Sequence, residues 1–381
     1  MRVAFVIPRL EPARGGVERY AFGLASGLAR RGVELCAFTT TPPERLPPRL
    51  PGFEIERIEV GAGTRAGRER RFGAAVRQRL AARPGWNAIQ EFGDAGLATH
   101  HRIGGGSHAA WLRARARYEP GAWPARIRSR DRRRIARQRE IWRDPRVALV
   151  ANSRLGRDHA AADAGIDPER IRVIHNGVDL EAFRPEPDRE RAARLRDGLG
   201  LGREALAVAF VGSGFARKGL RFAIAMLARA RARGARVELL VAGRGRLGPY
   251  RRLARRLGVA GAVRFAGPVA DVARIYAASD AFLLPSLYEP FSNAALEALA
   301  CGLPVLATAE SGIAEVVEDG REGFLLPRPD AVERGGWLLE RLAREPELRR
   351  AMGERAREGA RRLDQERHVE RMLALYRAPD V

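Results

Sequence analysis

The chain has 381 residues, 45% hydrophobic side chains and a formal net charge of +23. This length predicts two domains, each able to bury its own core, and no apolar run is long enough to span a bilayer. Cys36 and Cys301 lie in apolar surroundings and are predicted to be buried thiols, which excludes a disulfide framework. The spacing of the histidines and the lack of an Asp-x-Asp pair predict that no metal is bound.

Residues 1–8 predict a first β-strand, because this run is too short for a signal peptide and has no small-residue cleavage site. The protein is therefore expected in the cytoplasm. Its charge predicts an acidic partner, either a nucleic acid, an anionic membrane or a phosphorylated substrate. Lys218 is the single lysine of the chain. A bias toward arginine explains why the other basic residues are arginine and not lysine. It does not explain the excess of basic over acidic side chains.

Short strands alternate with helices in the first half of the chain. Strands are predicted over residues 3–8, 33–40, 53–60, 86–92, 147–151 and 171–174, and helices over residues 17–31 and 65–83. Gly15 and Gly16 precede the first helix. Backbone N–H groups at such a pair can approach a phosphate, with help from the helix dipole, although tight turns use glycine equally often.

Residues 99–108 place three consecutive glycines, at 104–106, among three of the six histidines. Consecutive glycines need unusual backbone angles or a close approach by another group. This segment is predicted to be either a flexible loop with incidental histidines or part of a site.

Residues 111–146 carry 13 arginines against four acidic residues, which is about +9 of the total charge. Three of the five tryptophans, Trp111, Trp123 and Trp142, lie in the same segment. Arginine interleaved with tryptophan is typical of a membrane interface, where each basic residue contributes about 1 kcal/mol near anionic lipid. A solvated basic helix is the plain alternative. Nucleic acid is a further one, although no recognisable reading module accompanies the patch.

The second half repeats the alternation of strands and helices, and the boundary between the halves is expected near residues 184–202. Strands are predicted over residues 205–212, 236–242, 263–266, 281–284 and 303–307, and helices over residues 220–233, 249–257 and 272–278. This pattern predicts an α/β protein with two doubly wound parallel sheets facing a cleft. Amphipathic helices are expected over the tail, residues 331–378.

The stretch at residues 284–308 contains two carboxylates, Glu289 on a turn and Glu297 inside a helix that Ser292 can cap and Gly302 can end. Glu297 has almost only apolar neighbours, so its charge is costly unless a partner bonds it. The partner can be internal, or it can be a ligand at the carboxyl end of a strand, where open α/β sheets bind their ligands.

Residues 211–219 join a strand to a helix and combine glycines, including Gly212, with the adjacent cations Arg217 and Lys218. A helix start that carries two cations repels itself unless an anion lies there. The compact ammonium of Lys218 suits a diphosphate, and the N–H groups at Ser292 and Asn293 can complete a phosphate cradle.

Several of these motifs together resemble glycosyltransferase family 4, whose retaining members have the GT-B fold. The segment at residues 263–327 looks like the nucleotide-sugar half of that family, with Glu289 and Glu297 matching its two-glutamate pattern. The loop VGSGFARKGL resembles the phosphate loop of the lipopolysaccharide core glucosyltransferases. GGVERY matches the glycine loop near the N-terminus, and HNGVD matches the interdomain segment. The resemblance covers nearly the whole chain and is tightest over residues 208–327.

The resemblance implies a role for each motif. Lys218 and Arg217 neutralise the donor diphosphate, so neither a metal nor another cofactor is expected, and Glu289 contacts the hexose near its reacting carbon. Glu297 binds the ribose hydroxyls. The remaining donor contacts are expected from Gly15, Gly16, Gly212, Phe291, Ser292 and Asn293 at the phosphates, and from Arg264, Ala266 and Pro268 at the base.

Two features depart from a simple match. Many members of the family place an arginine directly after the strand's glycine, whereas this chain has Ser213 there, and Arg217 must take that role. The polar group that assists at the sugar from the N-terminal half is also open. His101, His108 and Asp94 are the candidates.

The expected organisation is an acceptor-binding domain at residues 1–178, a nucleotide-sugar domain at residues 179–360 and a C-terminal helix at 361–381 that packs back on the first domain. The expected activity is transfer of a hexose from UDP-glucose to a lipid-linked saccharide, such as the lipopolysaccharide core, at the inner face of the cytoplasmic membrane. A nucleotide-sugar epimerase and transfer to another polysaccharide or lipid are the alternatives. Nucleic acid is not expected as a partner.

Overall fold

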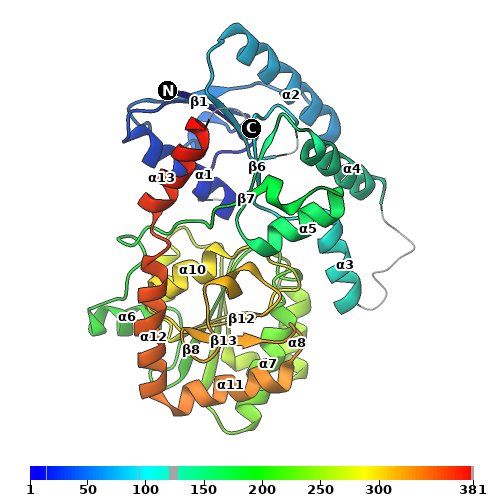
Figure 1. Cartoon of the computed structure of the whole chain (residues 1–381). Helices are drawn as coiled ribbons and strands as arrows, with labels where there is room; N and C mark the ends of the chain where they lie inside the picture. Colours follow the sequence, from blue (N-terminus) through cyan, green and yellow to red (C-terminus); the bar gives the residue numbers. More distant parts are fainter. Residues whose placement is uncertain (14, 94, 120–127, 379–381) are drawn as a thin grey trace. The chain divides into compact units, whose positions relative to one another are not determined.

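The computed structural model describes residues 1–13, 15–93, 95–119 and 128–378 (Figure 1). It divides the chain into two units. The first contains Met1–Ala110, Trp123–Gly177 and Gln365–Val381, and the second contains Trp111–Ala122 and Val178–Asp364. Apart from residues 111–119, which are grouped with the second unit, the chain leaves the first unit after Gly177 and returns to it at Gln365. The divisions predicted from the sequence lie after residues 178 and 360.

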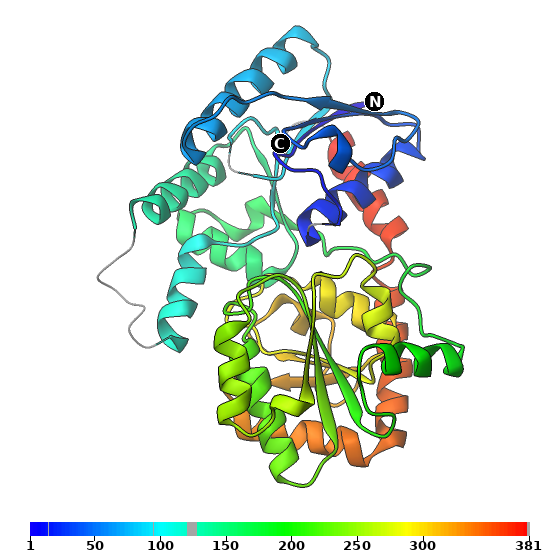
Figure 2. The same ribbon diagram turned by 180° about the vertical axis from the view of Figure 1, so that it is seen from behind.

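The first unit is built on a seven-stranded parallel sheet with the order β3-β2-β1-β4-β5-β6-β7. The strands are β1 (Arg2–Val6), β2 (Glu34–Thr39), β3 (Phe53–Arg57), β4 (Ala88–Glu91), β5 (His100–Ile103), β6 (Ala148–Ala151) and β7 (Ile171–Val173). The helices are α1 (Gly16–Ala29), α2 (Arg65–Ala82), α4 (Ser129–Arg143), α5 (Arg154–Ala164) and α13 (Gln365–Arg377). Helix α3 (His108–Tyr118) begins in this unit, and its residues from Trp111 on are grouped with the second unit. Helices cover both faces of the sheet (Figures 1 and 2). Val3 to Val6 are accordingly buried on both sides of β1, as in other doubly wound sheets.

The second unit has a six-stranded parallel sheet with the order β10-β9-β8-β11-β12-β13. The strands are β8 (Leu206–Val211), β9 (Val237–Ala242), β10 (Val263–Gly267), β11 (Ala281–Leu284), β12 (Val305–Thr308) and β13 (Gly323–Leu326). The helices are α6 (Arg189–Gly198), α7 (Leu220–Ala232), α8 (Gly248–Arg256), α9 (Ala273–Ala277), α10 (Asn293–Ala300), α11 (Val332–Arg344) and α12 (Pro346–Arg361). Short 3-10 turns lie at Pro43–Arg45, Pro168–Arg170, Ala260–Ala262 and Gly312–Glu315.

Two strands, β5 and β13, were not predicted from the sequence. Residues 99–108 were expected to be either a flexible loop or part of a site, with no strand, but His100 and His101 lie inside β5, which pairs with β4 and β6. The glycines come only after the strand has ended. The prediction of two doubly wound parallel sheets is confirmed by the strand orders.

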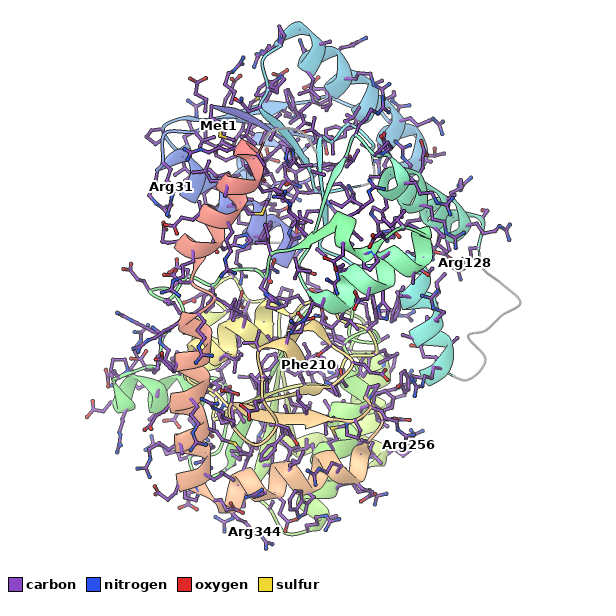
Figure 3. The ribbon with its side chains drawn as sticks, viewed as in Figure 1. Met1, Arg31, Arg128, Phe210, Arg256 and Arg344 are labelled. Carbon is purple, nitrogen blue, oxygen red and sulfur yellow. The ribbon has the colours of Figure 1, made fainter. Side chains whose placement is uncertain are left out.

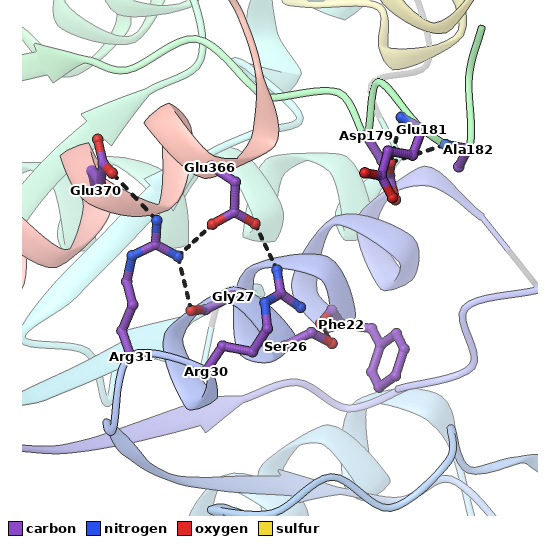
Figure 4. A network of polar contacts seen from close by, with 10 residues as sticks. All are labelled: Phe22, Ser26, Gly27, Arg30, Arg31, Asp179, Glu181, Ala182, Glu366 and Glu370. Atoms are coloured by element: carbon purple, nitrogen blue, oxygen red, sulfur yellow. Dashed lines mark hydrogen bonds and ion pairs between the residues drawn. The ribbon is translucent and has the colours of Figure 1, made fainter.

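The C-terminal helix α13 packs on α1 within the first unit. A Cβ atom on Gly27 would clash with Val369, so the glycine lets the two helices approach closely. Arg30 and Arg31, which directly follow α1, both donate to the Glu366 carboxylate, at 2.7 and 2.6 Å, as Figure 4 shows. The Arg30 pair is exposed and the Arg31 pair is partly buried, and surface ion pairs of this kind contribute little, about 0–1 kcal/mol each. Most of the stability of this contact therefore comes from the buried apolar residues of α13, which are Val369, Met372, Leu373, Leu375 and Tyr376.

His368 anchors the start of α13 through both ring nitrogens. Nδ1 lies 2.7 Å from the carbonyl oxygen of His175, and Nε2 lies 2.9 Å from the hydroxyl of Tyr20. The carbonyl can only accept, so Nδ1 carries the proton and Nε2 accepts from Tyr20. Burial lowers the pKa of His368 to about 3, and nearby arginines oppose its protonation further.

The tryptophans do not form the exposed surface that the sequence predicted. Trp142 is 1% exposed and packs in the core with Ile103 and Leu149. Trp111 is half-buried, and Trp123 lies outside the described residues. The arginines behave as predicted. Those at 128, 130, 132, 133, 134, 139 and 143 are exposed on and before α4, and Figure 3 shows Arg128 reaching outward while Phe210 lies in the interior of the second unit.

None of the described helices combines the length and the apolar character that a membrane span requires.

The stability of the fold should depend on pH through His368. Its folded pKa of about 3 lies below the ordinary 6.5, so its contribution is fully present above pH 6.5 and is lost as the pH falls toward 3. The loss amounts to about 1.4 kcal/mol per pH unit. We expect His368→Gln, which cannot titrate, to lose about 2 kcal/mol less than the wild type between pH 6.5 and 5. Urea unfolding at both pH values measures this, and equal losses would contradict a neutral histidine.

Candidate functional site

The candidate site lies where the strand order of the second sheet changes direction, between β8 and β11. These strands pair in parallel, so their carboxyl ends lie at the same edge. Residues 212–219 lead from β8 into α7, and residues 285–292 lead from β11 into α10. In open α/β sheets this switch point is where ligands bind.

The two loops are packed directly against each other. Gly219 has φ +74°, and a Cβ atom there would clash with the carbonyl oxygen of Pro285. The backbone N–H of Leu287 donates to the Arg217 carbonyl at 2.9 Å. The Arg217 guanidinium donates to the Tyr288 carbonyl at 3.3 Å. The loops therefore move as one unit, and side chains of one can meet those of the other.

Lys218 and Glu289 form a buried ion pair across this loop contact. The ammonium Nζ donates to Oε2 of Glu289, and the side chains are only 10% and 7% exposed. Arg217 lies 3.8 Å from the same oxygen and is more exposed. Burial lowers the pKa of Lys218, and the charge of Glu289 opposes that shift. The sequence predicted an anion at this helix start, and in the structure the anion is the carboxylate of Glu289.

Glu297 lies one turn inside α10. Ser292 caps this helix as predicted, because its hydroxyl accepts from the N–H of Ala295 at 3.1 Å. The Glu297 carboxylate is 8% exposed and accepts from the hydroxyl of Tyr276 at 2.8 Å. Of the two kinds of partner that the sequence left open for Glu297, the internal one is therefore present, and it is Tyr276. Burial and the charge of Glu297 raise the pKa of nearby Cys301 to about 12.

The other residues predicted at the donor phosphates lie beside this pair or in the first unit. Gly212 follows β8, and a Cβ atom there would lie 3.3 Å from Cε of Lys218. Phe291 and Ser292 are buried, and Asn293 begins α10 half-buried. Gly15 and Gly16 lie at the start of α1, where the N–H of Arg19 bonds the Gly15 carbonyl.

The predicted base-binding residues lie along β10, at the edge of the second sheet. The Arg264 guanidinium donates to the carbonyl oxygens of Gly200, at 2.6 Å, and Gly261. Arg264 is therefore engaged in holding the loop after α6. Ala266 and Pro268 lie at the carboxyl end of the strand. A groove of about 780 Å³ runs beside β10, and its lining includes Arg251, Arg264, Phe265 and Ala266.

The three candidates for the polar group of the first unit differ in their surroundings. His101 is buried inside β5. His108 begins α3, and its Nε2 lies 3.0 Å from Oδ1 of Asp131. Burial alone would raise the pKa of Asp131, but the hydrogen bond and charge of His108, the charge of Arg130 and a backbone hydrogen bond together lower the pKa. Asp94 lies outside the described residues.

Two polar residues were missed from the sequence. Glu91 ends β4, is fully buried and accepts from the backbone N–H groups of Gly96 and Leu97 at 2.9 and 3.2 Å. A single carboxylate at the end of an apolar strand was the available signal. Tyr276 is the second polar residue that was missed. No local pattern indicates its contact with Glu297, which lies 21 residues away.

The contact between the two loops should not tolerate a side chain at Gly219. We expect Gly219→Ala to cost about 3–4 kcal/mol, because the left-handed backbone angle is unfavourable and Pro285 must shift as well. Gly214→Ala is the matched control. Its φ is +76°, but a Cβ atom there meets nothing within 4 Å, so only about 1–2 kcal/mol is expected. Chemical unfolding measures both, and equal losses would contradict a constrained loop contact.

Known proteins match both halves of the chain. Residues 14–182 match the family model described as Glycosyltransferase Family 4, and residues 205–339 match the model described as Glycosyl transferases group 1. The D-inositol 3-phosphate glycosyltransferase of Actinosynnema mirum is 31% identical over 95% of this chain and 92% of its own length. The enzyme of the same name from Thermomonospora curvata is also 31% identical, over 95% and 90%.

Solved structures show the same architecture. WaaG, a glycosyltransferase involved in lipopolysaccharide biosynthesis, matches with a TM-score of 0.83 and 25% identity over 99% of this chain and 100% of its own. Sucrose-phosphate synthase from Thermosynechococcus elongatus matches with a TM-score of 0.79 and 23% identity, over 99% and 98%. With two parallel-sheet units, the paired loops at the switch point and relatives that span nearly its whole length, the chain belongs to glycosyltransferase family 4 and is a glycosyltransferase with the GT-B fold.

Proposed function

We propose that this protein transfers a hexose, with retention of configuration, from a nucleotide sugar to a lipid-linked saccharide. UDP-glucose is the donor and a lipopolysaccharide core the acceptor that we favour. The observation that carries the proposal is the Lys218–Glu289 pair, with Arg217 3.8 Å from the same carboxylate, at the switch point of the second sheet. Two cations and a carboxylate here match what a sugar diphosphate offers.

Donor binding would exchange partners within this pair. The diphosphate takes the ammonium of Lys218 and the guanidinium of Arg217, and Glu289 is released toward a hydroxyl of the hexose. As the bond to the sugar breaks, negative charge grows on the leaving diphosphate, and fixed cations lower the energy of that state. Because Lys218 and Arg217 supply the charge, we propose that no metal ion is required. Glu297, held by Tyr276, would bind the ribose.

The two candidate acceptors are suggested by the relatives of this chain. WaaG takes part in lipopolysaccharide biosynthesis, and the likeness to it covers 99% of this chain and 100% of WaaG. The relatives from Actinosynnema mirum and Thermomonospora curvata are D-inositol 3-phosphate glycosyltransferases that match over 95% of this chain, so a phosphorylated cyclitol is the second candidate acceptor. An epimerase on this fold is a further alternative, and turnover of the donor without any acceptor would reveal it.

A thermal-shift screen of UDP-, GDP- and ADP-sugars identifies the donor, because a ligand that binds only the folded state raises its melting temperature. The selected donor is then offered to a truncated lipopolysaccharide and to inositol phosphate. The anomeric configuration of the product, read by NMR, tests retention. If no nucleotide sugar shifts the melting temperature, the proposed function fails.

Removing the buried cation should abolish most of the activity. We expect Lys218→Met to lower kcat/KM by about 10²–10³-fold, the usual loss of one preorganised charge at a leaving group. Arg217→Met should cost only about tenfold, because this side chain is farther from the carboxylate and more exposed. Steady-state kinetics measure both.

Arg252→Met is the control for lost positive charge. Arg252 is exposed on α8 in the same unit, and its loss should leave kcat/KM unchanged. Near-normal transfer by Lys218→Met would overturn the assignment of the site.

We also propose that the enzyme works at an anionic membrane surface, held there by α4. Because Trp142 is buried it cannot contact lipid, and the proposed contact is made by the exposed arginines. Reversing Arg130, Arg133 and Arg134 to Glu should weaken binding to vesicles containing phosphatidylglycerol by at least about 100-fold at low salt, at about 1 kcal/mol per residue. Co-sedimentation measures the binding, which should also fall as salt rises.

The matched control reverses three exposed arginines of α8, Arg252, Arg255 and Arg256, and so makes the same change of net charge in the other unit. We expect this variant to keep most of its vesicle binding. Equal losses in the two variants would mean that total charge, and not α4, governs the contact.

A further inference from the structure

Tyr276 lies on the short helix α9 and contacts Glu297 of the proposed donor site. Its side chain is 1% exposed. The ring packs edge-on against Phe183, with centroids 6.0 Å apart, and at a tilt against Phe282 at 6.2 Å. Aromatic packing on two sides fixes the direction of the ring. The position of the hydroxyl is therefore set by the core of the second unit.

The hydroxyl lies 2.8 Å from Oε2 of Glu297 and 3.1 Å from the carbonyl oxygen of Ala294. It has one proton to donate, and a carboxylate is the stronger acceptor. The bond therefore restrains the last torsion angle of Glu297, which is otherwise broad and soft. One oxygen of the carboxylate is held at a fixed place on α10, and the direction of the other follows.

We infer that Tyr276 is a positioning residue that orients Glu297 toward the ribose diol of the donor. This inference rests on the proposed function, in which Glu297 binds the ribose. A carboxylate accepts from two neighbouring hydroxyls only if its plane faces them, so its orientation decides how well a diol is distinguished from a single hydroxyl. Tyr276 therefore sets the selectivity for ribonucleotides through Glu297, without touching the donor.

The purely structural alternative is that Tyr276 only satisfies a buried charge. In that case its hydroxyl matters for stability, and a variant without it binds all nucleotides equally less well. The two readings differ in one measurable quantity, the ratio of the affinities for a ribonucleotide and its deoxy analogue.

The experiment measures binding of UDP and 2′-deoxy-UDP, or of the corresponding pair for another base that the donor screen selects, by calorimetry. We expect the wild type to prefer the ribonucleotide by about 10–100-fold, the usual value of a hydrogen bond to a charged group. Tyr276→Phe should reduce this preference to a few-fold. It should also raise KM for the donor sugar while changing kcat by less than about twofold, because the ribose does not react.

Tyr376→Phe is the matched control. Tyr376 is also buried, and its hydroxyl donates to Oε1 of Gln90 at 2.9 Å in the first unit. The control loses the same atom and a comparable hydrogen bond, so its stability should fall by a similar amount while its nucleotide preference stays that of the wild type.

A second variant tests whether Tyr276 acts through Glu297. In a Glu297→Ala background the preference for the ribonucleotide should already be lost, and adding Tyr276→Phe should change it no further. If Tyr276→Phe weakens binding of both nucleotides equally, or changes the preference without Glu297, the inference is wrong. If the wild type binds UDP and deoxy-UDP equally, Glu297 does not bind the ribose and the inference also falls. If it binds no nucleoside diphosphate at all, the proposed function itself has failed.

Discussion

The second unit is organised around two opposite charges that are almost fully buried, Lys218 and Glu289. Removing such groups from water costs several kcal/mol for each, and their attraction repays this only when the geometry holds them together. That geometry comes from two loops at neighbouring strand ends, locked by the approach of Gly219 to Pro285. The pair therefore explains why the loops must be rigid. A loop that moved freely would leave either charge alone in a nonpolar place.

The same constraint accounts for how the site can work. In the proposed function, this pair, which is neutral without a ligand, holds one cation and one carboxylate where a sugar diphosphate would need them. A donor that separates the pair would give the Lys218 ammonium a phosphate in place of Glu289, and would give Glu289 a sugar hydroxyl that donates a hydrogen bond to it. Glu297 is a second buried carboxylate that has a partner without any ligand, because the Tyr276 hydroxyl donates to one of its oxygens.

Local patterns in the sequence predicted most of the second unit. The run at Ala281–Leu284 is uniformly apolar and bounded by turn residues, and Ser292 stands directly before a helix, so both elements follow from short-range rules. The features that the sequence did not predict depend on tertiary packing, often between residues far apart in the chain. Lys218 and Glu289 are 71 residues apart, and no local pattern predicts the ion pair between them. Trp142 was taken for a surface residue because arginines surround it in sequence, although the helical period places it on the buried side of α4.

The structure gives a physical reason why position 218 is lysine and not arginine. The sequence indicated only that this lysine is the single one in the chain. Its stem passes so close to Gly212 that a Cβ atom there would lie 3.3 Å from Cε, and its ammonium ends on a carboxylate that is itself buried. A planar guanidinium is wider and needs its several donors satisfied, which this narrow place does not offer. A compact ammonium can also turn from a carboxylate to a phosphate with little movement of its stem. In a chain whose every other side chain of the Lys/Arg type is arginine, lysine at position 218 is thus explained by the space available and, in the proposed function, by the exchange of Glu289 for a phosphate.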